Sequence, residues 1–194
     1  MAHTLNDYLT LLEREGLLAA PVPADLDREQ PIALVSCDSR TVVPGTLFVC
    51  KGAHFKAEFL DMAQSRGAVA YASEKRWPDS PLPCILLSDL RRAMALMADL
   101  CYDHPSGKLK VIGFTGTKGK SSATYYLKSV LDAYRSRQGQ GETGVISSLD
   151  TYDGAARFES HLTTPEPLDL QRHLAPAAQA GLEYLTMEVS SQAL

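Results

Sequence analysis

Apolar residues recur along this chain of 194 residues at spacings that predict short helices and strands in alternation. The first segment has helical spacing, with apolar residues at Leu5, Tyr8, Leu9 and Leu12. Thr4 and Asp7 have the spacing of a capping box at its start, and Gly16 predicts its end. The proline-rich stretch from Pro21 to Pro31 predicts a loop.

Beyond this loop, short apolar runs predict strands, and amphipathic segments between them predict helices. The predicted strands are Ala33–Val35, Leu47–Cys50, Ala68–Ala72 and Cys84–Leu87. One helix is predicted over residues 57–66, and a second follows a cap at Ser88 or Asp89 and ends before residues 104–107.

The second half of the chain repeats this alternation. Strands are predicted over Lys108–Thr115, residues 143–147 and Tyr184–Val189. Leu168–Ala180 is a predicted helix, and residues 135–142 are a predicted loop. Another helix is indicated by apolar residues on one face, namely Ala123, Tyr126, Leu127, Val130, Leu131 and Tyr134. Such alternation predicts an α/β protein with mainly parallel sheets, and residues 104–107 are the best boundary between two domains, 1–106 and 107–194.

Composition narrows the classes of function. Hydrophobic residues make up 45% of the chain and charged residues 22%, as in an ordinary globular protein. The net charge of -4 argues against a protein that binds nucleic acid or an anionic membrane. Neither a secretory signal pattern nor a membrane-spanning run is found, so we expect a cytoplasmic protein. The four cysteines lack metal-site spacing and are expected to be buried thiols.

The clearest chemical motif is a glycine-rich loop between a predicted strand and a predicted helix. The loop comprises Gly116, Thr117, Lys118, Gly119, Lys120, Ser121 and Ser122. Glycines let backbone N–H groups approach phosphate oxygens, Lys120 can reach the β- and γ-phosphates, and Ser121 can ligate Mg²⁺. Phe114 stands where the general P-loop pattern has its first glycine. The alternative is an ordinary turn between strand and helix, and the context favours an ATP site.

Three weaker motifs accompany the loop. Glu188, at the end of an apolar strand, either holds Mg²⁺ in the crevice at the edge of the sheet or faces solvent. Thr163 and Thr164 precede a proline, as in loops that donate hydrogen bonds to a ligand, or simply form a loop. Residues 38–40 and His54 are by themselves more typical of a solvated turn and a structural histidine.

Taken together, these segments resemble the Mur ligases, the UDP-N-acetylmuramoyl-peptide ligases of peptidoglycan synthesis, and most closely the tripeptide-forming branch. Four stretches in matching order carry the resemblance, residues 38–74, 111–127, 162–174 and 187–194. The resemblance implies an N-terminal mixed α/β UDP-binding domain followed by an incomplete P-loop-type ATPase domain with a parallel sheet. It also implies ATP and Mg²⁺ as cofactors, with UDP-N-acetylmuramoyl-dipeptide and an amino acid as substrates.

The resemblance also assigns roles to residues. It implies that Ser39 and the region of His54 contact the UDP-sugar, and that residues 116–122 hold ATP. Thr163, Thr164 and Ser190 are placed near the muramoyl-dipeptide, and Glu188 is placed with Ser121 on Mg²⁺. Lys120 and Glu188 would be the catalytic residues. The reaction of the family forms an acyl phosphate, from which an amine displaces phosphate to give an amide.

The chain departs from the family at several positions. Lys118 and Leu162 stand where asparagine is common, and Gln192 stands where histidine is usual. The family has a third domain that recognises the amino acid, so we expect these residues to be part of a longer ligase and inactive alone. Two alternatives remain, a stand-alone module that binds UDP-sugars or nucleotides, and a relative such as folylpolyglutamate synthetase, which does not account for a preceding domain of about 106 residues.

Overall fold

The computed structural model describes residues 3–24, 26–52 and 55–193. It divides the chain into two compact units, Met1–Cys101 and Tyr102–Leu194. The predicted domains, 1–106 and 107–194, divide the chain slightly later, and their assignment to UDP-sugar and ATP stays a prediction. Among the helices of the described residues, none combines the length and the apolar character needed to cross a bilayer.

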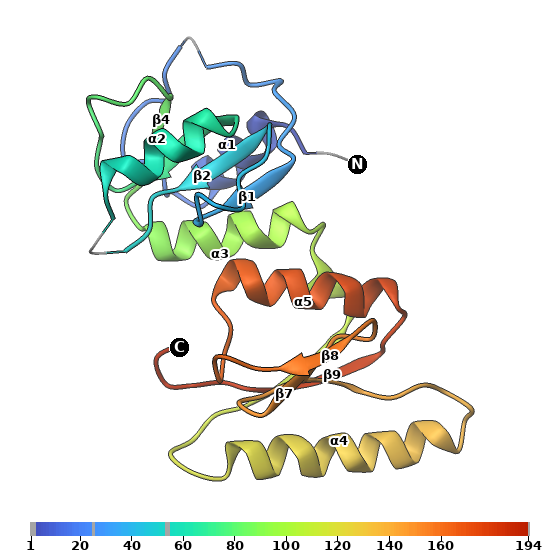
Figure 1. Ribbon diagram of the computed structural model, residues 1–194. Helices are drawn as coiled ribbons and strands as arrows, with labels where there is room; N and C mark the ends of the chain where they lie inside the picture. Colours follow the sequence, from blue (N-terminus) through green and yellow to red (C-terminus); the bar gives the residue numbers. More distant parts are fainter. Residues whose placement is uncertain (1–2, 25, 53–54, 194) are drawn as a thin grey trace. The chain divides into compact units, whose positions relative to one another are not determined.

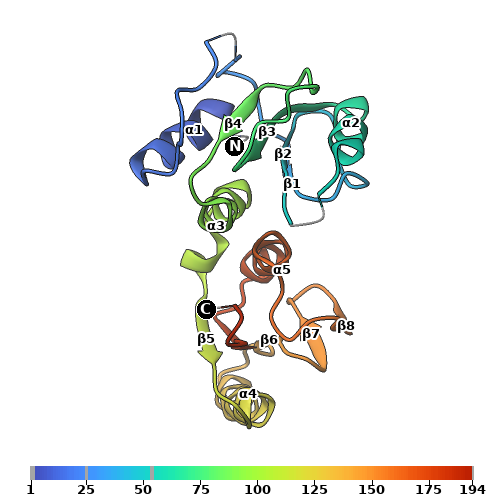
Figure 2. The same ribbon diagram turned by 90° about the vertical axis from the view of Figure 1, so that its left-hand side faces the viewer.

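The first unit is a parallel sheet of four strands between helices. The strands lie side by side in chain order and are β1 (Leu34–Ser36), β2 (Thr46–Val49), β3 (Ala68–Ser73) and β4 (Cys84–Leu86). The helices are α1 (Leu5–Arg14), α2 (Ala57–Ser65) and α3 (Leu90–Cys101). Helix α2 covers one face of the sheet, and α1 and α3 lie on the other face (Figure 2). These elements confirm the pattern predicted for the first half of the chain.

Local hydrogen bonds explain where two of these helices begin. The carboxylate of Asp7 accepts a hydrogen bond of 2.8 Å from the N–H of Thr4, as the capping box predicts. Asp89 accepts a hydrogen bond of 2.9 Å from the N–H of Arg92, so the cap of α3 is Asp89 rather than Ser88. Cys50 and Cys84 are buried, as expected, whereas Cys37 and Cys101 are only half-buried.

The second unit is a sheet of five strands with a helix on each face (Figure 1). Its strands are β5 (Lys110–Phe114), β6 (Gly144–Ile146), β7 (Asp150–Tyr152), β8 (Arg157–Glu159) and β9 (Tyr184–Glu188), in the order β5-β9-β6-β7-β8. Its helices are η1 (Pro105–Lys108), α4 (Lys120–Ser136) and α5 (Pro167–Gln179). In both views, α4 and α5 lie on opposite faces of this sheet.

The second sheet is mixed, which corrects the prediction of a parallel sheet for this half. Strands β5, β9 and β6 are parallel, but β6 with β7 and β7 with β8 are antiparallel pairs. The β7–β8 hairpin was not predicted, because its strands have three residues each and β8 is exposed. The three parallel strands place their carboxyl ends at one edge of the sheet, where ligands bind in α/β folds.

Helix α4 turns a polar side toward the sheet. Of the six apolar residues that identified it, Tyr126, Val130 and Tyr134 have relative exposures of 77%, 61% and 55%, whereas Ala123, Leu127 and Leu131 are half-buried. Its buried residues include the cations Lys128 and Arg135. Both cations form ion pairs, which reduce the cost of burying them.

Helix α5 supplies the apolar core of the second unit. Leu174 and Ala177 from this helix pack with Ile146, Leu185 and Met187 from the sheet. The core of this unit therefore lies mainly on the α5 face, whereas the fully buried residues of α4 are the polar Thr124, Lys128 and Arg135.

Candidate nucleotide site

The predicted phosphate loop lies between β5 and α4, which confirms the strand–turn–helix context. Gly116 and Gly119 have φ angles of 150° and 81°, a region that favours glycine. Gly119 is the N-cap of α4, so the N–H groups of the first helical turn point toward the loop. This first turn contains no acidic residue, and an anion there would interact favourably with the helix dipole.

The side chain of Lys120 reaches back to the first residue of the loop. Its Nζ donates a hydrogen bond of 3.0 Å to the carbonyl oxygen of Gly116. Thr117 and Lys118 are exposed, and Lys120 is half-buried. The amine is therefore held beside a turn that phosphate oxygens can reach from solvent.

Glu188 and Ser121 meet beside this loop, although 67 residues separate them in sequence. The hydroxyl of Ser121 donates to Oε2 of Glu188 at 3.0 Å. Glu188 has an exposure of only 2%, so the interpretation that it faces solvent is wrong. Oxygen donors of this kind suit Mg²⁺.

A cation at this pair would have few protein ligands. The described residues contain no group of three or more His, Cys, Asp or Glu side chains that could hold a metal. Mg²⁺ is commonly bound through one or two side chains together with water and substrate phosphates. The chemistry of Ser121 and Glu188 therefore fits Mg²⁺ bound with a nucleotide, and their role as ligands stays a prediction.

Ser148 is a third member of this site that sequence reasoning missed. Its backbone N–H and its hydroxyl both donate to Oε1 of Glu188, each at 2.9 Å. Ser148 closely follows β6, which pairs with β9 in parallel. The signal in the sequence was a small polar residue just after a strand, which is informative only when the neighbouring strand is known.

The loop predicted to contact the muramoyl-dipeptide lies at the end of the same strand. The hydroxyl of Thr164 donates to the carbonyl oxygen of Glu188 at 3.0 Å and accepts from the N–H of Ser190 at 2.8 Å. Thr163 is half-buried beside them. The structure thus brings together Thr164, Ser190 and Glu188, and the contacts of these residues with a substrate stay predictions.

The residues predicted to bind the UDP-sugar belong to the first unit. Ser39 is buried, and its hydroxyl donates to the sulfur of Met62 at 3.3 Å. Arg40 donates to the Asp38 carboxylate through Nε at 2.9 Å and Nη2 at 2.7 Å, and these hydrogen bonds lower the pKa of Asp38. His54 lies outside the described residues. The assignment of Ser39 to the UDP-sugar stays a prediction.

A cavity of about 500 Å³ lies beside the β7–β8 hairpin and was also missed. Leu162 and Pro165, which flank the threonine pair, contribute to its lining together with Phe158 and His173. The rings of Phe158 and His173 stand 5.1 Å apart, and burial lowers the pKa of His173. No residue of the phosphate loop lines this cavity, which lies beside the residues that flank the threonine pair.

Comparison with known proteins finds relatives of this chain. Residues 114–194 match the model of the Mur ligase middle domain. The chain is 45% identical over 159 residues to the UDP-N-acetylmuramoyl-L-alanyl-D-glutamate–L-lysine ligase of Streptococcus thermophilus, covering 82% of this chain and 32% of that enzyme. It is 39% identical over 194 residues to the UDP-N-acetylmuramyl-tripeptide synthetase of Lactobacillus delbrueckii subsp. bulgaricus, covering 98% of this chain and 37% of the relative.

Residues 114–194 thus belong to the Mur ligase middle-domain family, and the chain as a whole is homologous to about a third of these ligases. Its fold is similar to that of a solved UDP-N-acetylmuramoyl-L-alanyl-D-glutamate–2,6-diaminopimelate ligase, with a TM-score of 0.70 at 22% identity, covering 99% of this chain and 37% of the other. MurF from Acinetobacter baumannii gives a TM-score of 0.57 at 19% identity, covering 98% of this chain and 36% of MurF. The 194-residue chain spans about a third of the length of these relatives.

Proposed function

We propose that this chain supplies the UDP-sugar-binding and ATP-binding parts of a peptidoglycan ligase. The ligase would add an amino acid to UDP-N-acetylmuramoyl-L-alanyl-D-glutamate. One observation carries the proposal. In a chain 39% to 45% identical to such enzymes, Ser121 and Glu188 meet at 3.0 Å beside a phosphate loop. The names of the relatives supply the substrate class.

The reaction would begin with attack of the substrate carboxylate on the γ-phosphate of ATP. This step gives an acyl phosphate and ADP, and the amine of the incoming amino acid then displaces phosphate and forms the amide. The N–H groups of the loop and Lys120 would hold the phosphates, while Ser121 and Glu188 would hold Mg²⁺. Catalysis would rest on positioning and on neutralising the charge of the transferred group.

The predicted substrate loop lies within reach of the same strand end. Because Thr164 is hydrogen-bonded to the backbone at Glu188 and Ser190, a substrate bound at the threonine pair would lie near the metal carboxylate. The 500 Å³ cavity beside Leu162 and Pro165 gives the substrate room on that side. This arrangement supports a carboxylate substrate approaching the γ-phosphate from the threonine loop.

The first experiment is calorimetric titration of the 194-residue chain with UDP-N-acetylmuramoyl-L-alanyl-D-glutamate. We expect saturable binding, and we expect Thr163→Val to weaken it about fivefold, which is the effect of one hydrogen bond. ATP affinity is the internal control, because it should be unchanged in this variant. A folded wild-type chain that gives no binding heat would refute the substrate assignment.

The chain alone should bind and not ligate, because it spans about a third of the relatives. The second candidate is a stand-alone module that binds UDP-sugars or nucleotides. Adding the remaining part of a related ligase as a separate polypeptide separates the two. Restored amide formation supports the ligase, whereas binding without restoration supports the module.

A further inference from the structure

The carboxylate of Glu188 is held from two sides. Ser121 at the start of α4 donates to Oε2, and Ser148 donates twice to Oε1. A cation that replaces the Ser121 contact would leave the Ser148 contacts in place. The position of Ser148 therefore decides where Glu188 presents its oxygens.

Ser148 belongs to a tight turn built on the side chain of Ser147. The buried hydroxyl of Ser147 accepts hydrogen bonds from the N–H groups of Leu149 and Asp150, at 3.1 and 3.2 Å. The N–H of Ser147 donates to the carbonyl oxygen of Asp150 at 3.1 Å. This turn connects β6 to β7, so whatever fixes Ser147 and Asp150 also fixes Ser148.

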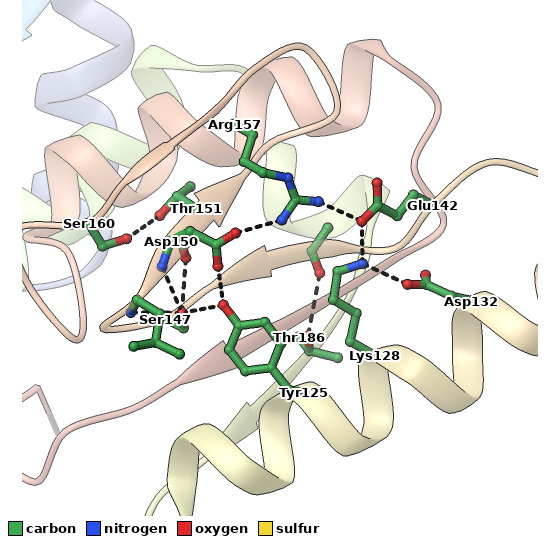
Figure 3. Close-up of polar contacts among 12 residues, drawn as sticks. Tyr125, Lys128, Asp132, Glu142, Ser147, Asp150, Thr151, Arg157, Ser160 and Thr186 are labelled. Carbon is green, nitrogen blue, oxygen red and sulfur yellow. Dashed lines mark hydrogen bonds and ion pairs between the residues drawn. The ribbon is translucent and has the colours of Figure 1, made fainter.

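Tyr125 contacts both ends of this turn from α4 (Figure 3). Its hydroxyl lies 3.0 Å from the hydroxyl of Ser147 and donates to the carboxylate of Asp150. Burial, with the hydrogen bond to Asp150, raises the pKa of Tyr125, so its hydroxyl keeps its proton. Although burial opposes it, hydrogen bonds from Tyr125 and Arg157 lower the pKa of Asp150, which stays charged.

Further ion pairs hold Asp150, the partner of Tyr125, in place. Arg157 on β8 donates to Asp150 and to Glu142, both at 2.5 Å, and Glu142 also accepts from Lys128 on α4 at 2.6 Å. Figure 3 shows these groups forming a continuous row between α4 and the hairpin. Because Tyr125 contacts the turn at both Ser147 and Asp150, the turn has little freedom to move relative to α4.

We propose that Tyr125 is a positioning residue for the predicted Mg²⁺ site, because it fixes the turn through which Ser148 holds Glu188. This inference rests on the proposed function for its metal, but the link from Tyr125 to Ser148 does not depend on it. Ser121 and Tyr125 lie on the same helix, so the helix that presents Ser121 also fixes the second support of Glu188.

The test compares Tyr125→Phe with Tyr126→Phe in the 194-residue chain. Both variants lose one hydroxyl from adjacent positions of α4, and Tyr126 has an exposure of 77%. Two readouts are measured, amide hydrogen exchange by NMR without ligand, and calorimetric ATP affinity with and without Mg²⁺. In Tyr125→Phe we expect exchange at Ser148 to accelerate about fivefold and the gain in ATP affinity from Mg²⁺ to fall about fivefold.

The controls separate a positioning role from a loss of stability. Exchange at Val145 in β6 and ATP affinity without Mg²⁺ should stay within about twofold of the wild type, and Tyr126→Phe should change neither readout. Equal acceleration at Ser148 and Val145, or an unchanged Mg²⁺ gain, would overturn the inference. A wild-type chain with no Mg²⁺-dependent ATP binding would refute the proposed function, while the exchange readout would still decide the link from Tyr125 to Ser148.

Discussion

Lys128 is one of the two buried cations of α4, and Lys128→Met removes its charge while keeping the length of its side chain. Its side chain has an exposure of 7%, and its Nζ lies 2.6 Å from Asp132 and 2.6 Å from Glu142. After the substitution, Asp132 keeps a hydrogen bond of 2.7 Å from the N–H of Thr143, and Glu142 keeps Arg157.

The magnitude follows from these partners. Breaking a buried ion pair typically costs about 3 to 5 kcal/mol, because a buried charge is left without compensation. Here the two carboxylates have exposures of 30% and 43% and keep other donors, so solvent and these donors reduce the loss. We therefore expect Lys128→Met to lower the free energy of unfolding of the second unit by about 2 kcal/mol.

The pH dependence has a definite sign. Burial would raise the pKa of Asp132, but hydrogen bonds with Lys128 and Thr143 lower it below 3.8. The pKa of Glu142 lies below 4.5, mainly because of its hydrogen bond with Lys128. Carboxylates with lowered folded-state pKa values stabilise the fold above their unfolded pKa values, and this contribution disappears as the pH falls through the folded ones. The wild type should therefore lose stability below about pH 5 more steeply than Lys128→Met.

The assay is urea unfolding followed by circular dichroism and by fluorescence. The chain has one tryptophan, Trp77, which lies in the first unit and reports its transition separately. The matched control is Lys110→Met, since Lys110 has an exposure of 62% and pairs with one carboxylate at 2.7 Å. This control should lower the free energy of unfolding far less than Lys128→Met does, because solvent screens an exposed ion pair. An equal cost for the two variants would refute the reasoning.

Two further pairs of substitutions test the fold and the loop. Gly67 has a φ of 97°, and a Cβ there would lie 2.8 Å from Cα of Pro44, so Gly67→Ala should destabilise the first unit by about 3 kcal/mol. Gly16, with a φ of 66° and no atom within 4 Å of an added Cβ, should cost only about 1 kcal/mol when changed to alanine, and equal urea midpoints for the two variants would contradict this. Lys120→Ala should weaken ATP binding in calorimetry at least about tenfold, and Lys118→Ala about threefold, because Lys120 reaches back to the first residue of the loop. A larger loss at Lys118 would contradict that assignment.

Sequence patterns predicted the elements whose burial follows their periodicity. The helix from Leu5 buries Leu5, Tyr8, Leu9 and Leu12, and the strand that ends at Glu188 is largely buried. The orientation of α4 did not follow the same rule. Lys128 and Arg135 are buried because partners such as Glu142 and Glu183 neutralise them, and those partners lie on other elements.

For the candidate site, the sequence predicted the loop but not the residues that hold Glu188. The glycine spacing and the strand–helix context were enough to predict the phosphate loop. The sequence did not decide whether Glu188 is buried, because its hydrogen-bond donors Ser121 and Ser148 lie 67 and 40 residues away along the chain. The β7–β8 hairpin was missed because its strands have only three residues each and β8 is exposed, so that no apolar alternation marks them.

The most direct test of the central claim is calorimetric titration of ATP into the 194-residue chain with and without Mg²⁺, for the wild type and for Glu188→Gln. If the loop, Ser121 and Glu188 form one site, Mg²⁺ should tighten ATP binding by the wild type at least about tenfold and should have almost no effect on Glu188→Gln. Binding that does not respond to Mg²⁺, or an equal response in both proteins, would contradict the account.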